Sequence, residues 1–248
     1  MASLHEAIRA NDVGLINYLL LTKRGDPNVN EGGIPPLFLC KSGEAAGALL
    51  KAGANKEYQY VGDEHNPPGM PLHTAAAHGR ASVVEQLIAA GAVVDSRSST
   101  GRTPLHTVIS SVCVKMLVRA HADVNAVDMD GNTPLIVAAG SARIWVTDAL
   151  LDAGALVNRV NVDLDTALLV ACERWQYSTA MHLLHAGADA TMGRPGRTPL
   201  HLAATGRPQY GPDAYYRSNI SGIQREHNRL AQVYAAFSKA AYGYSLKV

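Results

Sequence analysis

The chain has 248 residues, of which 47% are hydrophobic and 17% are charged, and its formal net charge at pH 7 is +1. This charge gives no support for nucleic-acid binding, which needs a basic surface. The first residues mix acidic and basic side chains, unlike a secretion signal, and no apolar stretch is long enough to cross a membrane. We therefore expect an intracellular protein without membrane insertion, cytoplasmic or alternatively nuclear.

One short pattern recurs along the whole chain. Its clearest copies are the identical hexapeptides GRTPLH at 101–106 and at 196–201. Aligned leucines follow one another at steps of 30 to 35 residues: Leu4, Leu37, Leu72, Leu105, Leu135, Leu168 and Leu200. A fixed period of this length indicates a repeat architecture.

The third copy shows what each repeat predicts. Residues 71–76 form a short helical pattern that is interrupted at 78–79. Val83, Val84 and Leu87 then fall on one face of a second helix, which ends at Gly91. Each repeat is therefore predicted to hold a short inner helix followed by an outer helix.

This pattern of a turn and two antiparallel helices resembles the ankyrin repeat family. The resemblance covers about residues 2–205 and implies an all-α solenoid of seven helix-turn-helix units with finger loops like β-hairpins. Residues 1–205 are predicted to be the repeat array, with the first unit as N-terminal cap. Residues 206–248 are predicted to hold an insertion and a capping helix that complete the last unit.

Most of the hexapeptide is explained by the fold. Its Thr can cap the inner helix, its Pro suits the first helical turn, and its Gly suits a turn with positive φ. The resemblance implies that the histidines, which are His5, His73, His106 and His201, form hydrogen bonds between neighbouring repeats. Other repeats carry apolar residues at this position, which argues against catalysis. We therefore predict no enzymatic activity.

The positions of the cysteines and of the polar side chains also favour structural roles for these residues over catalysis or metal binding. Cys40, Cys113 and Cys172 fall at core positions of the pattern, without a CxxC pair. His182 and His185 are spaced i, i+3 and could share a surface metal, but no third ligand is evident, and no P-loop, GxSxG or HExxH motif occurs. We therefore expect neither a cofactor nor a metal site.

Several departures from the pattern mark candidate sites. Repeats two and four are three residues short, and we place the missing turn near residues 41–44 and 110–112, as trimmed helix ends. The connection between Gly53 and Pro71 is longer than the others, and it carries Tyr58 and Tyr60. Leu164 stands where other repeats have Gly, so either the turn differs in shape or the leucine is displayed for contact.

Two further features stand near the predicted groove. Arg174 and Trp175 lie between the helices of the sixth repeat, where they are either a partner anchor or inter-repeat packing. The finger positions carry several arginines beside acidic residues, a basic bias that favours an acidic partner; the alternative is a solvated edge. Within the hexapeptide, Arg102 and Arg197 are expected to be free of structural roles.

The resemblance implies a monomeric scaffold or adaptor that binds a protein or peptide partner on the concave surface of fingers and inner helices. The alternative is an effector-like or regulatory protein in which residues 206–248 carry a separate docking or other activity. The candidate contact residues are Tyr58, Tyr60, Arg97, Arg102, Met129, Asn132, Leu164, Asp165, Arg174, Trp175, Arg194 and Arg197.

Overall fold

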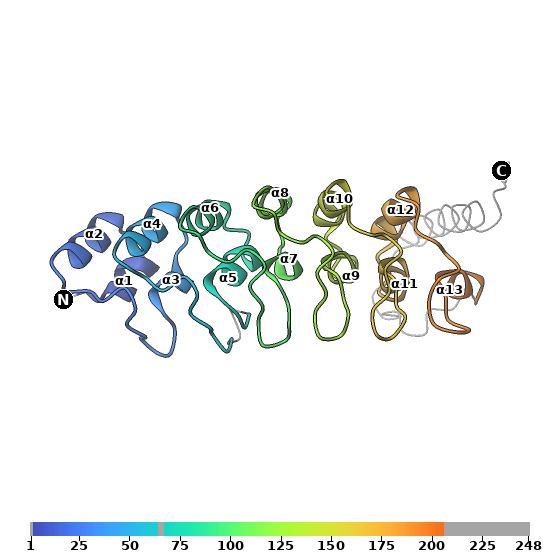
Figure 1. Ribbon diagram of the computed structural model, residues 1–248, viewed down its shortest axis with the longest axis horizontal. Helices are drawn as coiled ribbons and strands as arrows, with labels where there is room; N and C mark the ends of the chain where they lie inside the picture. The colour runs from blue at the N-terminus through green and yellow to red at the C-terminus, as the bar shows by residue number, and fades with distance from the viewer. Residues whose placement is uncertain (1, 64–66, 206–248) are drawn as a thin grey trace, which may run out of the picture. The chain divides into compact units, whose positions relative to one another are not determined.

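The structure is a computed structural model that describes residues 2–63 and 67–205, with side chains described as far as residue 202 (Figure 1). Over these residues it is built from helices, with isolated β-bridges in place of any sheet. No helix in the described ranges is long and apolar enough to cross a membrane. The chain divides into two compact parts, Met1–Met129 and Asp130–Val248, and each is described by itself.

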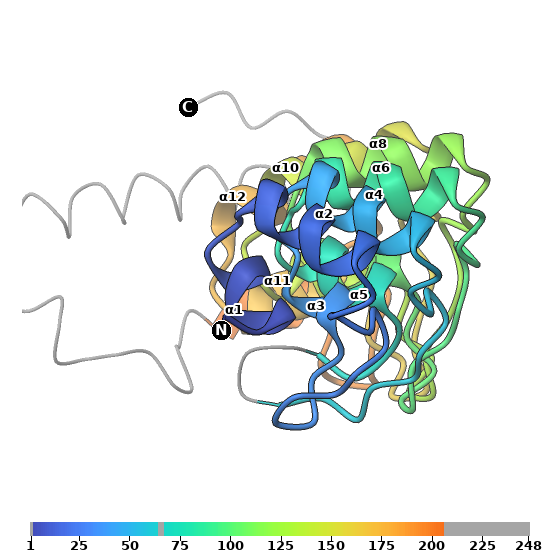
Figure 2. The same ribbon diagram turned by 90° about the vertical axis from the view of Figure 1, so that its left-hand side faces the viewer.

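The N-terminal part contains four pairs of helices. The inner helices lie between the outer helices and the loops, as Figures 1 and 2 show. The inner helices are α1 (Leu4–Arg9), α3 (Pro36–Leu39), α5 (Pro71–Ala77) and α7 (Pro104–Thr107). The outer helices are α2 (Val13–Leu21), α4 (Gly43–Lys51), α6 (Ala81–Ala89) and α8 (Ser111–Arg119).

The C-terminal part continues the same pattern. Its pairs are α9 (Pro134–Ala139) with α10 (Ile144–Asp152) and α11 (Ala167–Glu173) with α12 (Tyr177–His185), followed by the inner helix α13 (Pro199–Thr205). The insertion and capping helix predicted in residues 206–248 lie outside the described residues, and so does the separate activity considered there.

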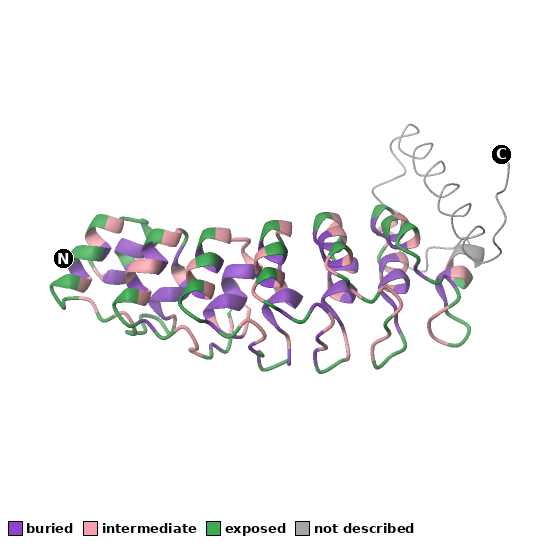
Figure 3. Ribbon diagram, turned by 45° about the horizontal axis from the view of Figure 1, so that its top comes forward, coloured by how far each residue is buried: buried purple, intermediate pink, exposed green. Residues whose placement is uncertain are grey.

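The repeated threonine and proline start the inner helices as predicted. The hydroxyl of Thr133 accepts a hydrogen bond from the Ile136 N–H at 3.3 Å, and Pro134 occupies the first turn, where no N–H is needed. At the start of α7, the hydroxyl of Thr103 lies 2.9 Å from Nδ1 of His106. The leucines after Pro36, Pro71, Pro104 and Pro134 are buried, and Leu200 is partly buried, so the apolar core of each part runs along its inner helices (Figure 3).

Two of the repeated histidines link neighbouring repeats in the N-terminal part. Nδ1 of His73 accepts from the Met70 N–H at 3.2 Å, which leaves Nε2 to donate to the Arg102 carbonyl at 2.8 Å. Nε2 of His5 contacts the Ile34 carbonyl at 2.9 Å. Both side chains are buried, and burial lowers the pKa of His73. These contacts are the inter-repeat hydrogen bonds that the resemblance implies.

The three cysteines are free thiols. Cys40 and Cys113 are fully buried, as the repeat pattern predicts, whereas Cys172 is partly buried. Burial raises the pKa of Cys40 and of Cys172 to about 12. A thiolate nucleophile is therefore disfavoured at these two positions.

The missing turn of repeats two and four is absent from the end of the inner helix, next to the predicted locations. α3 and α7 have four residues each, compared with seven in α5, whereas α4 and α8 keep the nine residues of α6. The shortening leaves carbonyl groups at the end of α3 without helical partners. Nη1 of Arg80, from the next repeat, donates to two of them, the carbonyls of Phe38 at 3.1 Å and Cys40 at 3.0 Å.

Candidate binding surface

The finger loops lead from each outer helix to the next inner helix, and short bridges close several of them. In the C-terminal part, Val160 pairs with Thr166 and Arg194 pairs with Arg197. The turns in these fingers need positive φ, which Gly196 supplies at 72°. Leu164 adopts the same conformation at 65° and is 47% exposed, so the turn keeps its shape and displays the leucine.

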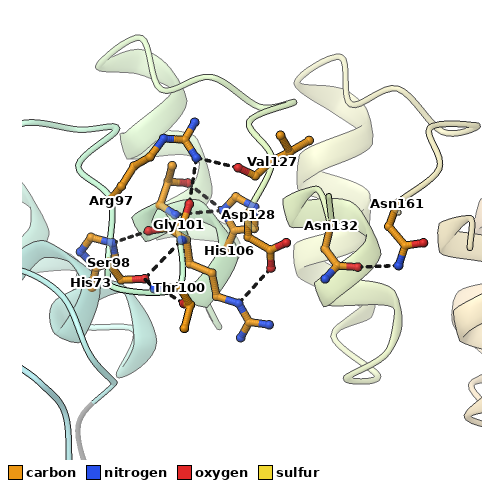
Figure 4. A network of polar contacts seen from close by, with 12 residues as sticks. His73, Arg97, Ser98, Thr100, Gly101, His106, Val127, Asp128, Asn132 and Asn161 are labelled. Carbon is orange, nitrogen blue, oxygen red and sulfur yellow. Dashed lines mark hydrogen bonds and ion pairs between the residues drawn. The ribbon is translucent and has the colours of Figure 1, made fainter. Parts of the chain in front are cut away.

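In the N-terminal part, neighbouring fingers are joined by hydrogen bonds. Nη1 of Arg97 donates to the carbonyl of Gly101 at 2.8 Å and to that of Val127 at 2.6 Å (Figure 4). The Met129 N–H donates to the Thr100 carbonyl at 3.1 Å. The Arg97–Val127 and Met129–Thr100 bonds join one finger to the next, so they hold the two loops in a fixed arrangement.

An ion pair strengthens the same junction. Nε of Arg102 lies 3.1 Å from Oδ2 of Asp128, whose side chain is only 1% exposed. Such a buried carboxylate needs a paired charge or hydrogen bonds to offset its loss of water. Arg102 therefore has a structural role in the N-terminal part.

Comparable contacts join the fingers of the C-terminal part. Nδ2 of Asn161 donates to Oδ1 of Asn132 at 2.9 Å (Figure 4), and the Val162 N–H donates to the Asp130 carbonyl at 3.0 Å. The guanidinium of Arg194 donates to both oxygens of the buried Asp165 carboxylate, at 2.7 and 2.6 Å. This bidentate geometry is the strong form of an arginine–carboxylate pair.

The expectation that Arg102 and Arg197 are free of structural roles was wrong. Arg197 forms an ion pair with Glu173, Nε to Oε1 at 2.8 Å, and Arg102 pairs with Asp128. The folded repeats bring a carboxylate of a neighbouring finger or inner helix within reach of each guanidinium. Arg102, Arg194 and Arg197 are therefore each paired with a carboxylate of the protein itself.

Apolar side chains remain at the finger tips. Met129 is 72% exposed in the N-terminal part, and Val162 is 68% exposed beside Leu164 in the C-terminal part. Val162 was missed by the sequence reasoning. Its signal was an apolar residue two positions before a leucine in a turn, where polar residues are usual.

The two tyrosines of the long connection pack against the core. The Tyr60 ring is 8% exposed and lies 5.2 Å from the Phe38 ring, between centroids, while Tyr58 meets Phe38 edge-on at 6.3 Å. The Tyr60 hydroxyl donates to Asp63 at 2.7 Å, which raises the pKa of Tyr60 to about 12. Tyr60 therefore covers Phe38 rather than facing a partner, which corrects its expected role as a contact residue.

Arg174 and Trp175 pack within their own part of the chain. A Cβ at Gly140 would lie 3.3 Å from Cδ of Arg174, so this arginine passes over the end of the preceding inner helix. The Trp175 ring lies edge-on to Tyr177 at 6.0 Å. The Arg174 contact supports the alternative of packing between repeats, whereas the Trp175 contact lies within one repeat, and the role of the pair as an anchor stays a prediction.

Comparison with known proteins identifies the repeats. A family model for three copies of the ankyrin repeat matches residues 72–161. The ankyrin-repeat domain of Bcl-3 superposes with a TM-score of 0.66 and 24% identity, covering 82% of this chain and 93% of that one. The chain contains ankyrin repeats.

Two much larger proteins contain segments that are similar in sequence to this chain. Human Rabankyrin-5 is 38% identical over 107 residues, 41% of this chain and 9% of Rabankyrin-5. The Drosophila melanogaster Notch protein is 39% identical over 88 residues, 34% of this chain and 3% of Notch. The chain thus spans less than a tenth of the length of each of these two relatives. Ankyrin repeats generally mediate protein–protein interactions and are typically non-enzymatic.

Proposed function

We propose that this protein is a binding scaffold or adaptor that holds a segment of a partner protein on its fingers and inner helices. The proposal rests on two observations together: the finger loops are held in place by ion pairs and hydrogen bonds, and apolar side chains are exposed at their tips. Arg102–Asp128 and Arg194–Asp165 fix the fingers of their respective parts.

Finger loops that are already held in place favour binding, because a flexible loop loses conformational entropy when it becomes ordered against a partner. A loop that is already held in place avoids most of that cost. Binding energy in protein interfaces is concentrated in a few large, well-packed side chains. Met129 and Leu164 supply exposed apolar groups of this kind on loops that hydrogen bonds already position.

The test compares finger-tip variants with a matched apolar control. The full-length protein, Met129→Ser, Leu164→Gly and Val93→Ser would each be immobilised and exposed to labelled cell extract, with quantitative mass spectrometry of the bound proteins. Val93 is 56% exposed but lies outside the finger tips, after helix α6. We expect at least one protein to be lost from a tip variant and retained by Val93→Ser. Equal recovery of every bound protein by all four chains would contradict the proposal.

We further propose that the protein acts as a cytoplasmic monomer without nucleic acid. The near-neutral net charge of +1 supports this view, because sequence-independent binding to nucleic acid relies on excess Lys and Arg. Size-exclusion chromatography with light scattering should give the mass of one chain, 26.3 kDa, and a dimer mass would contradict the proposal.

A further inference from the structure

The 160–166 finger of the C-terminal part carries a strained apolar residue at its tip. Leu164 adopts φ 65°, a conformation in which the equivalent positions of neighbouring fingers have Gly131 and Gly196. A side chain in this region clashes with its own backbone, so leucine costs stability that glycine would not. Strain of this type at an exposed position is typical of a functional residue.

The tip is also held in place against the preceding finger. The Val162 N–H donates to the carbonyl of Asp130, and the Leu164 N–H donates to the carbonyl of Asn161 at 3.1 Å, closing the turn. Val162 and Leu164 are therefore displayed together on a fixed loop, where they are 68% and 47% exposed. Two adjacent apolar side chains on a rigid loop suit a large apolar side chain of a partner.

The charges around this tip are mainly acidic. Asp163 lies between the two apolar residues, and Asp130 lies on the finger that receives the Val162 N–H; both are exposed. The arginines on the other side are paired, Arg194 with Asp165 and Arg197 with Glu173. Asp163 and Glu173 also act on Arg194, so three carboxylates face two guanidinium groups.

Another cation belongs to the same finger. The side chain of Arg159 is exposed at the base of the loop, and its backbone N–H donates to the Leu156 carbonyl at 3.2 Å. Arg159 precedes the Val160–Thr166 bridge. By contrast, Asp163 lies between the two apolar tip residues in the chain, and Asp130 lies on the neighbouring finger that Val162 contacts. The chemistry next to Val162 and Leu164 is therefore apolar and acidic.

We propose that the 160–166 finger binds a partner segment with a large apolar side chain flanked by lysine or arginine. This inference rests on the proposed scaffold function and specifies the chemistry of the partner. It replaces the acidic partner favoured by the sequence, because Arg194 and Arg197 on the following finger are already paired with carboxylates.

A phage-displayed library of random dodecapeptides tests the inference with the full-length protein as target. We expect enriched peptides to carry a net positive charge and at least one large apolar residue. Leu164→Gly should weaken their binding about tenfold or more, as expected for an interface anchor. Asp163→Asn should weaken it about two- to fivefold at low salt, within the range of exposed charge pairs. Leu164→Gly should at the same time raise the urea midpoint, because it relieves strain.

Leu156→Gly is the matched control. Leu156 is 54% exposed, lies outside the finger and has no positive φ, so this change should leave peptide affinity within twofold and should not raise the urea midpoint. Opposite effects of Leu164→Gly on binding and stability exclude simple unfolding as the cause of weaker binding.

The outcomes separate the two proposals. Enriched acidic or uncharged peptides that lose affinity with Leu164→Gly would overturn the basic partner and leave the finger surface as a binding site. Basic peptides that bind Leu164→Gly and Met129→Ser as well as the unchanged protein would overturn both. A library without enrichment over the Leu164→Gly chain would also overturn the inference.

Discussion

Replacement of Arg80 by Met tests how the protein tolerates its shortened inner helices. Nη1 of Arg80 donates to the Phe38 and Cys40 carbonyls at the end of α3, and methionine keeps the apolar stem while it removes both donors. A hydrogen bond to a charged group contributes roughly 1.5–3 kcal/mol. Since both bonds share one nitrogen, we expect a loss of about 2–3 kcal/mol in the free energy of unfolding. For a chain of this length, this corresponds to a decrease in Tm of about 4–12 °C.

The assay is urea unfolding followed by far-UV circular dichroism, with a thermal scan as a second measurement. Arg80→Lys should lie between Arg80→Met and the unchanged protein, because an ammonium group cannot reproduce the planar guanidinium. Arg119→Met, at the exposed end of α8, is the control and should change stability by less than about 0.5 kcal/mol. If Arg80→Met is no more destabilised than this control, then Arg80 does not compensate for the short helix.

Three further experiments, two with substitutions and one with a thiol reagent, have defined outcomes. Ala142→Gly should raise the urea midpoint, by about 0.5–1 kcal/mol in stability, because this exposed alanine has φ 55°; an unchanged midpoint would contradict the strain argument. Burial lowers the pKa of His73, so the unfolded chain takes up this proton first as the pH falls. The free energy of unfolding should therefore decline below about pH 6.5, and less steeply in His73→Gln, as urea titrations at several pH values can show. Cys40 and Cys113 should resist a thiol reagent at pH 8 until urea unfolds the chain, whereas rapid labelling of either without urea would show that it is accessible.

Local features of the sequence predicted the repeat fold well because each repeat encodes its own caps and turns. The threonine caps of α9 and α11, the prolines in the first helical turn and the glycines with positive φ all lie at the expected positions. These features depend on residues a few positions apart, so a single sequence contains the information. The same register placed Leu164 at a glycine position and left open whether the turn keeps its shape; its φ of 65° shows that it does.

Contacts between repeats account for the features that the sequence did not predict. A deletion between two landmarks does not reveal which helix is shorter, and Arg80, 42 residues after Phe38, allows the inner helix to shorten. The finger arginines looked free because their carboxylates lie about one repeat away, 26 residues for Arg102–Asp128 and 29 for Asp165–Arg194. Searching for opposite charges at that spacing would have found both pairs.

The hydrogen bonds between fingers also affect how the loops exchange with solvent. The side chains of Met129 and Val162 are among the most exposed apolar groups of the described residues, yet their N–H groups donate to the preceding finger. Amide exchange with deuterium should therefore be slow at these two positions, as in the helices and unlike an ordinary surface loop. The loop tips, where contact with a partner is proposed, would then open only when a whole repeat separates from its neighbour.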